Sequence, residues 1–184
     1  MGREDGSISS QAPKVVPAYE LLERIGEGGS AEVWRGRHRL LGRAAAVKLL
    51  RTEDAISELM RERFKLEARA AAALRSPHAV EIYDFGTVDD GTPFLAMELL
   101  HGVDLQRLVK RFGPQEPGRT IRLLEQACDV LNEAHSCQMV HRDIKPANIF
   151  VTRRGDQGDF ARVVDFGLVR AIGCDRDEPT TPQN

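Results

Sequence analysis

The side chains best suited to chemistry gather in two short stretches near the end of the sequence. Asp143, Lys145 and Asn148 lie within one such stretch, and Asp165 lies in the next. An aspartate can accept the proton of a hydroxyl group, and a lysine can neutralise phosphate charge. Asn and Asp oxygens suit Mg²⁺, which usually binds phosphate oxygens as well. These residue types and spacings predict a phosphoryl-transfer site.

Together the two stretches resemble the catalytic loop and the metal-binding turn of eukaryotic-type protein kinases. They read His141-Arg142-Asp143-Ile144-Lys145-Pro146-Ala147-Asn148 and Val164-Asp165-Phe166-Gly167. The resemblance implies that Asp143 and Lys145 are catalytic and that Asn148 and Asp165 hold Mg²⁺. It also implies that His141 packs with Phe166 and that Arg142 pairs with a phosphate on the activation segment, or forms a surface salt bridge. Lys145 and the Ile-Lys-Pro-Ala-Asn wording favour a Ser/Thr kinase of bacterial type.

A glycine-rich turn, Gly26-Glu27-Gly28-Gly29, separates two expected strands at residues 19–25 and 31–36. Glycines let backbone N–H groups approach phosphate oxygens closely. A dinucleotide-binding loop also begins with two spaced glycines but opens a helix, whereas Val33 continues a strand. By resemblance, the turn binds ATP together with its neighbours Ile25 and Val33, although Ala31 replaces the family's third glycine. The alternative is a plain hairpin.

Lys48, on an expected strand at residues 44–49, matches the lysine that contacts the ATP phosphates in this family. A lysine facing a cleft from a central strand needs a charge partner. An expected helix at residues 58–74 offers Glu58, Glu62 and Glu67. Glu67 fits the family pattern best, although it would be a solvated helix charge under the alternative interpretation.

The segment Met97-Glu98-Leu99-Leu100, called the hinge below, resembles the stretch that binds adenine in kinases. The resemblance implies that Met97 guards the back of the pocket and that Glu98 and Leu100 offer backbone groups. It places Val33, Ala46 and Phe150 around the base. Asp104 would bind the ribose, or cap the helix expected at residues 104–111, or do both.

The remaining pattern predicts strands at residues 80–87, 93–99, 148–152 and 162–164, with a polar, glycine-rich hairpin tip in solvent at 152–159. A long amphipathic helix is expected at residues 120–136, with an apolar stripe of Leu124, Cys128, Leu131 and His135. The predicted fold is α+β and protein-kinase-like. A small lobe of antiparallel sheet and one regulatory helix precedes an incomplete, mainly helical large lobe.

The predicted organisation is a disordered tail at residues 1–18 and a kinase domain at 19–184, with the small lobe and hinge at 19–100 and part of the large lobe at 101–184. The family's Ala-Pro-Glu motif and later helices do not occur in these 184 residues. We therefore expect compromised catalysis. Thr180 and Thr181 lie where phosphorylated threonines of an activation segment could lie.

Composition narrows the classes of function. The net charge of −2 argues against a nucleic-acid-binding surface, and no apolar run is long enough to cross a membrane. Three cysteines lack metal-ligand spacing, which favours reduced thiols and a cytoplasmic location. The leading hypothesis is an ATP- and Mg²⁺-dependent transferase acting on Ser/Thr residues of protein substrates. The alternatives are a non-catalytic fragment that binds nucleotide or a partner, and a small-molecule phosphotransferase.

Overall fold

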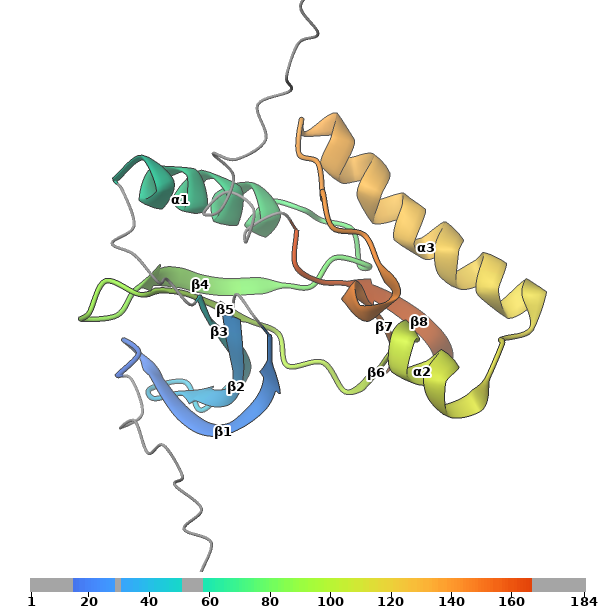
Figure 1. Ribbon diagram of the computed structural model, residues 1–184, viewed down its shortest axis with the longest axis horizontal. Coiled ribbons are helices and arrows are strands. Elements are labelled where there is room, and N and C mark those ends of the chain that lie inside the picture. The colour runs from blue at the N-terminus through green and yellow to red at the C-terminus, as the bar shows by residue number, and fades with distance from the viewer. Residues whose placement is uncertain (1–14, 29–30, 51–57, 167–184) are drawn as a thin grey trace, which may run out of the picture.

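The computed structural model describes residues 15–28, 31–50 and 58–166, without the side chains of residues 58–61, 63 and 67 (Figure 1). Its first part is an antiparallel five-stranded sheet in the order β1-β2-β3-β5-β4. The elements of this small lobe are β1 Tyr19–Glu27, β2 Ala31–His38, β3 Ala44–Leu50, α1 Glu58–Ala72, β4 Ile82–Thr87 and β5 Pro93–Met97. The predicted fold class is confirmed.

Alternation along β3 explains which residues face the cleft. Ala45, Val47 and Leu49 pack on one face of the sheet with Phe94 and Val16. Ala46 and Leu50 pack on the other face, where α1 adds Phe64 and Ala68. Because successive strand side chains point to opposite faces, Lys48 lies on the α1 side.

The second part is a three-stranded sheet, β6-β7-β8, covered by helices on the other side of the hinge (Figure 1). Its elements are β6 Gly102–Asp104, α2 Leu105–Phe112, α3 Pro117–Ser136, the 3₁₀ turn Pro146–Asn148, β7 Ile149–Arg154 and β8 Gln157–Val163. Strand β6 was not expected. A Cβ on Gly102 would lie 2.2 Å from Val151 O, so the close approach of β6 to its partner strand β7 requires glycine.

Several predicted boundaries were wrong for identifiable reasons. The hairpin expected at 152–159 is present, but its tip is shorter than predicted, because β7 and β8 continue to a tight turn at Gly155 and Asp156. The strand expected at 80–87 begins at Ile82, since the Val80 N–H donates to Val163 O of the large lobe at 3.0 Å. Val16 is fully buried, so the packed part of the chain includes residues assigned above to the tail.

The predicted apolar stripe of α3 was also wrong, by one residue. The buried side chains are Leu123, Ala127, Val130 and Ala134. Leu124 is 47% exposed, and Cys128 and His135 are exposed as well. Both stripes have helical spacing. The stripe that contains two alanines is the one buried in the core, because its small side chains let β8 pack closely against α3.

This rotation of α3 can be tested with one chemical change at neighbouring positions. Leu123→Ala is expected to lower the free energy of unfolding by about 2–5 kcal/mol, because Leu123 is 1% exposed. Leu124→Ala, the matched control, should change it by no more than about 0.5 kcal/mol. Urea unfolding followed by circular dichroism measures both, and equal losses would contradict the observed helix face.

In the part of the chain that the structure describes, no helix is long and apolar enough to cross a membrane.

Candidate active site

The loop after α3 holds Asp143 by contacts within a few residues. Lys145 Nζ donates to Asp143 Oδ2 at 2.8 Å, and Asn148 Nδ2 donates to the same oxygen at 3.2 Å and to Asp143 O at 2.8 Å. The hydrogen bond from Lys145 is the main cause that lowers the pKa of Asp143. The side chain is 48% exposed. The loop therefore presents an ionised carboxylate to solvent at neutral pH.

His141 connects this loop to the segment before Asp165. It is 2% exposed, and its Nε2 lies 2.9 Å from Val164 O. Its Nδ1 accepts from the Asp143 N–H at 3.3 Å, which assigns the proton to Nε2. Its ring lies 4.7 Å from that of Phe166, the contact that the resemblance implies. The arrangement suits a packing residue rather than a base.

Burial lowers the pKa of His141, so the folded chain holds a neutral ring. In the unfolded chain the histidine has its ordinary pKa of about 6.5 and binds a proton below that pH. The unfolded state then binds more protons, so stability contributed by the neutral ring is present above that value and is lost as pH falls.

We expect the free energy of unfolding to drop between pH 7.5 and 5.5 in the parent and to drop less in His141→Gln. Urea titrations at both pH values measure it. His101→Gln, at an exposed histidine, is the matched control and should follow the parent. An identical pH dependence in parent and His141→Gln would contradict a neutral buried ring.

Asp165 and Asn148, the predicted metal ligands, meet at the end of β8. The Val164 N–H donates to Asn148 O at 3.0 Å, which places the two residues on adjoining backbone. Because Asn148 Nδ2 donates to Asp143, the amide oxygen is the side-chain atom left to bind a cation. Carboxylate and amide oxygens are the donors that Mg²⁺ prefers, so these residues fit the ion. Asp165 has a positive φ of 62°, as does Arg142 at 61°, which is uncommon for these residues.

Lys48 is 4% exposed and has a charge partner across the two lobes. Its Nζ lies 2.7 Å from Asp165 Oδ1. The predicted partner, Glu67, lies in α1, but its side chain is outside the described residues, so that pairing stays a prediction. The observed pair joins the residue expected at the ATP phosphates to one expected at Mg²⁺.

A cavity of about 470 Å³, called the interlobe cavity below, lies between the lobes. This volume is within the ~300–1,000 Å³ common for small-molecule sites. Its lining includes five predicted binding residues and four that were not predicted: Ile25, Gly26, Val33, Asp104 and Phe150, then Gln106, Arg107, Lys110 and Ala147. Ala46, Met97 and Leu100 pack in one apolar cluster with Val33. Glu27 and Gly28 follow in the turn, whereas Gly29 lies outside the described residues.

Asp104 caps α2, as one of the two predicted roles requires. Its Oδ1 accepts from the Arg107 N–H at 2.8 Å, and its Oδ2 lies 3.3 Å from Arg107 Nε. Asp104 is 6% exposed and lies in the wall of the interlobe cavity. The ribose role of Asp104 stays a prediction. A ribose hydroxyl would have to replace part of the contact between Asp104 and Arg107.

The hinge backbone is already partly engaged. The Glu98 N–H donates to Glu81 O at 2.9 Å. Of the two backbone groups of Glu98, the carbonyl is therefore the one left for the predicted contact with adenine. The Glu98 side chain is not in the lining of the interlobe cavity, and it pairs with Arg162 of β8. Met97, the predicted back-pocket residue, is 5% exposed.

Two polar residues of α3 that the sequence analysis did not identify support the site. Gln126 Oε1 accepts from the Ala161 N–H at 2.9 Å, and its Nε2 donates to Asp159 O at 3.1 Å. Glu133 accepts from the N–H groups of Arg75 and Ser76 at 2.7 Å each. Gln126 thus holds β8, and Glu133 holds the connection between α1 and β4. Their positions beside the buried face of α3 were the available signal.

Comparison with known proteins gives a consistent result. Residues 19–182 match a family model described as protein kinase domain. Serine/threonine-protein kinase PknH of Mycobacterium tuberculosis is 43% identical over 153 residues, covering 83% of this chain and 24% of the relative. Serine/threonine-protein kinase pkn3 of Myxococcus xanthus is 37% identical over 161 residues, covering 88% of this chain and 29% of that relative. The chain therefore spans under a third of either protein.

The solved structures add the same fold. A cysteine-to-alanine mutant of the Mycobacterium tuberculosis PknI kinase domain superposes with a TM-score of 0.73 at 29% sequence identity. The superposition covers 86% of this chain and 64% of that kinase domain.

Proposed function

This chain belongs to the protein kinase family, and we propose that it binds Mg·ATP and supports transfer of the γ-phosphate to Ser and Thr hydroxyls of protein substrates. The observation that carries the proposal is the arrangement of two carboxylates. Asp143 stands with Lys145 and Asn148 on the loop, and Asp165 stands with Lys48 where the lobes meet. This arrangement supports separate roles for the two carboxylates.

The first role is to prepare the hydroxyl. Asp143 is ionised and half exposed, so its carboxylate can accept a hydrogen bond from a substrate hydroxyl and orient the oxygen for attack. Lys145 donates a hydrogen bond to Asp143 Oδ2. From this position its ammonium group is close enough to neutralise phosphate charge that develops beside the same oxygen.

The second role is to hold the nucleotide. Lys48 would bind phosphate oxygens, while Asp165 and Asn148 would hold Mg²⁺, which supplies charge neutralisation when bound. The apolar cluster of Val33, Ala46 and Met97 would contact the base. We propose a cytoplasmic location in keeping with a site for intracellular ATP.

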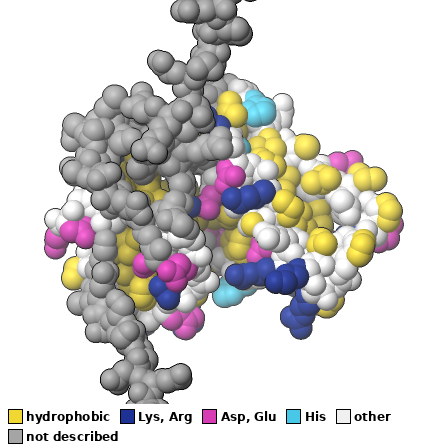
Figure 2. Space-filling view, in the orientation of Figure 1, with side chains coloured by type: hydrophobic (Ala, Val, Ile, Leu, Met, Phe, Trp, Pro, Cys, Tyr) yellow, Lys and Arg dark blue, Asp and Glu magenta, His cyan; other side chains and the backbone are white. Residues whose placement is uncertain are grey.

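A second candidate function, nucleotide binding without efficient transfer, has its own supporting observation. Apolar side chains near the catalytic loop and on α3 are exposed, with Val140 at 54%, Ile144 at 45% and Ile121 at 56%. Figure 2 shows hydrophobic side chains gathered over the large-lobe side of this view. A catalytic loop whose neighbouring apolar side chains are exposed is less firmly fixed by packing. A displacement of its carboxylate by ~1 Å can cost about 10² in rate.

The two candidates are distinguished with the 184-residue chain itself. We expect Mg²⁺-dependent binding of a fluorescent ATP analogue and slow transfer of radiolabel from ATP to a generic basic protein. Rapid transfer that disappears in Asp143→Asn would establish catalysis and exclude the non-catalytic candidate. Failure to bind Mg·ATP would contradict both.

A further inference from the structure

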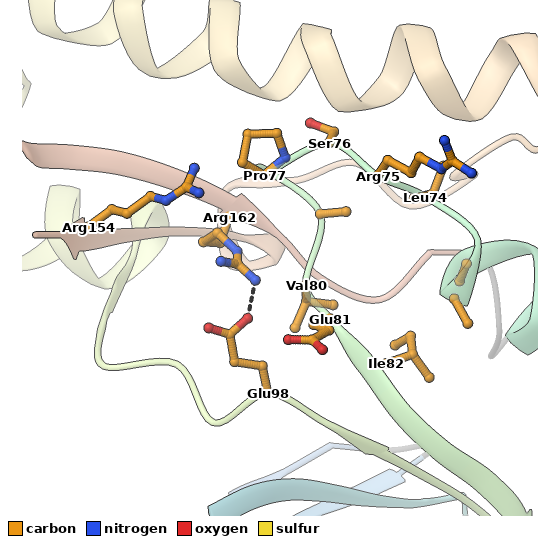
Figure 3. A pocket seen from close by; sticks show the side chains of 13 residues that line it. Leu74, Arg75, Ser76, Pro77, Val80, Glu81, Ile82, Glu98, Arg154 and Arg162 are labelled. Atoms are coloured by element: carbon orange, nitrogen blue, oxygen red, sulfur yellow. Dashed lines mark hydrogen bonds and ion pairs between the residues drawn. The ribbon is translucent and has the colours of Figure 1, made fainter.

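A second cavity of about 250 Å³, called the back cavity below, lies behind the hinge (Figure 3). Its walls come from the end of α1, the α1–β4 connection, the hinge and the β7–β8 hairpin. It shares no lining residue with the interlobe cavity. Nothing in the proposed phosphoryl transfer uses it.

The walls of the back cavity combine an apolar part with charged groups. The apolar part consists of Ala71, Ala72, Leu74, Pro77, Ala79, Val80 and Ile82. Three arginines and two glutamates supply the charges, namely Arg75, Arg154, Arg162, Glu81 and Glu98. In Figure 3, Arg162 faces Glu98, and Arg154 and Arg75 lie at opposite sides of the cavity.

Arg162 is the group with unused binding capacity. Its side chain is 15% exposed, and its Nη2 donates to Glu98 Oε2. Its Nε is buried and has no hydrogen-bond partner among the described residues. A buried donor without a partner costs about 1–3 kcal/mol. Nε and Nη2 form one edge of the guanidinium, and that edge matches the two oxygens of a carboxylate.

The surrounding charges favour an anion at this edge. Glu81 is engaged by Arg43, whose Nη2 lies 3.1 Å from Glu81 Oε2, so its charge is balanced from outside the cavity. The negative charge of Glu98 balances the positive charge of Arg162 only. Arg75 and Arg154 are both exposed at the rim, and they leave the lining with an excess of positive charge.

We propose that the back cavity binds a small organic acid, with a carboxylate on the Nε–Nη2 edge of Arg162 and a compact apolar body against Val80 and Ile82. The incoming carboxylate takes the place of Glu98 at Nη2 and provides the partner that Nε lacks. A volume below the ~300–1,000 Å³ of ordinary ligand pockets excludes a nucleotide. A bare phosphate would leave the apolar wall uncovered. The bound acid would touch both the hinge and the strand that leads to Asp165.

The probe is benzoate, added to the 184-residue chain and followed by amide chemical shifts in NMR. We expect saturable shifts at Val80, Glu98 and Arg162. Benzamide, which has the same shape without the charge, should bind at least tenfold more weakly. Inorganic phosphate at the same concentration should not displace benzoate. Equal binding of benzamide, displacement by phosphate, or no saturable shift would overturn the proposal.

Two variants test the arginine. Arg162→Gln is expected to weaken benzoate binding at least tenfold, and Arg153→Gln, an exposed arginine outside the cavity lining, is the matched control. Glu98→Gln keeps Arg162 and removes the competing carboxylate, so it should bind benzoate more tightly than the parent. This second variant decides the question if Arg162→Gln does not fold. Unchanged or weaker binding by Glu98→Gln contradicts the exchange of carboxylates.

Discussion

Asp165→Ala is expected to lower the affinity for Mg·ATP by at least tenfold and to remove most of its dependence on Mg²⁺. A charge-assisted contact in a cleft contributes about 1.5–3 kcal/mol, and 1.4 kcal/mol corresponds to a factor of ten in affinity. The change removes a proposed oxygen ligand of the metal. It also removes the carboxylate that lies 2.7 Å from Lys48 Nζ and leaves a lysine whose side chain is only 6% exposed without that partner.

Calorimetric titration with ATP, with and without Mg²⁺, measures the effect. Asp165→Asn separates the two causes, because it keeps one side-chain oxygen for the metal but loses the charge that Lys48 needs. Asp156→Ala, at an exposed carboxylate in the β7–β8 turn, is the control for loss of one negative charge. Thermal unfolding of each variant checks that the lobes remain folded. Parental affinity and metal dependence in Asp165→Ala would rule out Asp165 as a ligand.

The parts of the site that could be predicted from sequence are those fixed by nearby residues. Asp143, Lys145 and Asn148 contact one another because a short turn brings them together, so their spacing already contained the geometry. Alternation along β3 similarly fixes the face on which Lys48 lies. Asp104 was expected at the start of a helix, and it caps α2.

The parts that could not be predicted depend on how distant elements meet. The rotation of α3 follows from its packing on β8, which Gln126 holds through the backbone of residues 159 and 161. Helical spacing alone allowed the stripe with Leu124 as readily as the stripe with Leu123. The contact between Glu98 and Arg162 joins residues far apart in the sequence. A sequence pattern predicts the faces of an element but not which face a distant partner will cover.

The surroundings of Asp143 make its carboxylate a weak base. Its pKa is lowered, first by the hydrogen bond from Lys145, and a carboxylate with a lowered pKa accepts a proton less readily. The hydrogen bonds from Lys145 and Asn148 instead fix where Asp143 Oδ2 lies. We therefore expect Asp143 to act mainly by orienting the attacking hydroxyl, with the proton leaving late in the reaction.

Asp143→Asn should accordingly slow phosphoryl transfer by about 10²-fold or more while Mg·ATP affinity stays within a factor of about three. Asparagine keeps the size of the side chain and a side-chain oxygen that can still accept from Asn148 Nδ2, and the bond from Asn148 Nδ2 to the backbone oxygen at position 143 is unchanged. Asp143 has no described contact with Lys48 or Asp165, so nucleotide binding should persist. Rates are followed with radiolabelled ATP and a basic protein substrate, in this chain and in the same chain joined to the remaining large-lobe sequence of a kinase relative.

Asp156→Asn is the matched control for the same change of charge and should transfer at the parental rate. If Asp143→Asn matches the parent while Asp165→Ala does not, the catalytic carboxylate is not Asp143 and the site binds nucleotide by a different arrangement. A large loss of ATP affinity in Asp143→Asn would instead assign this residue to binding.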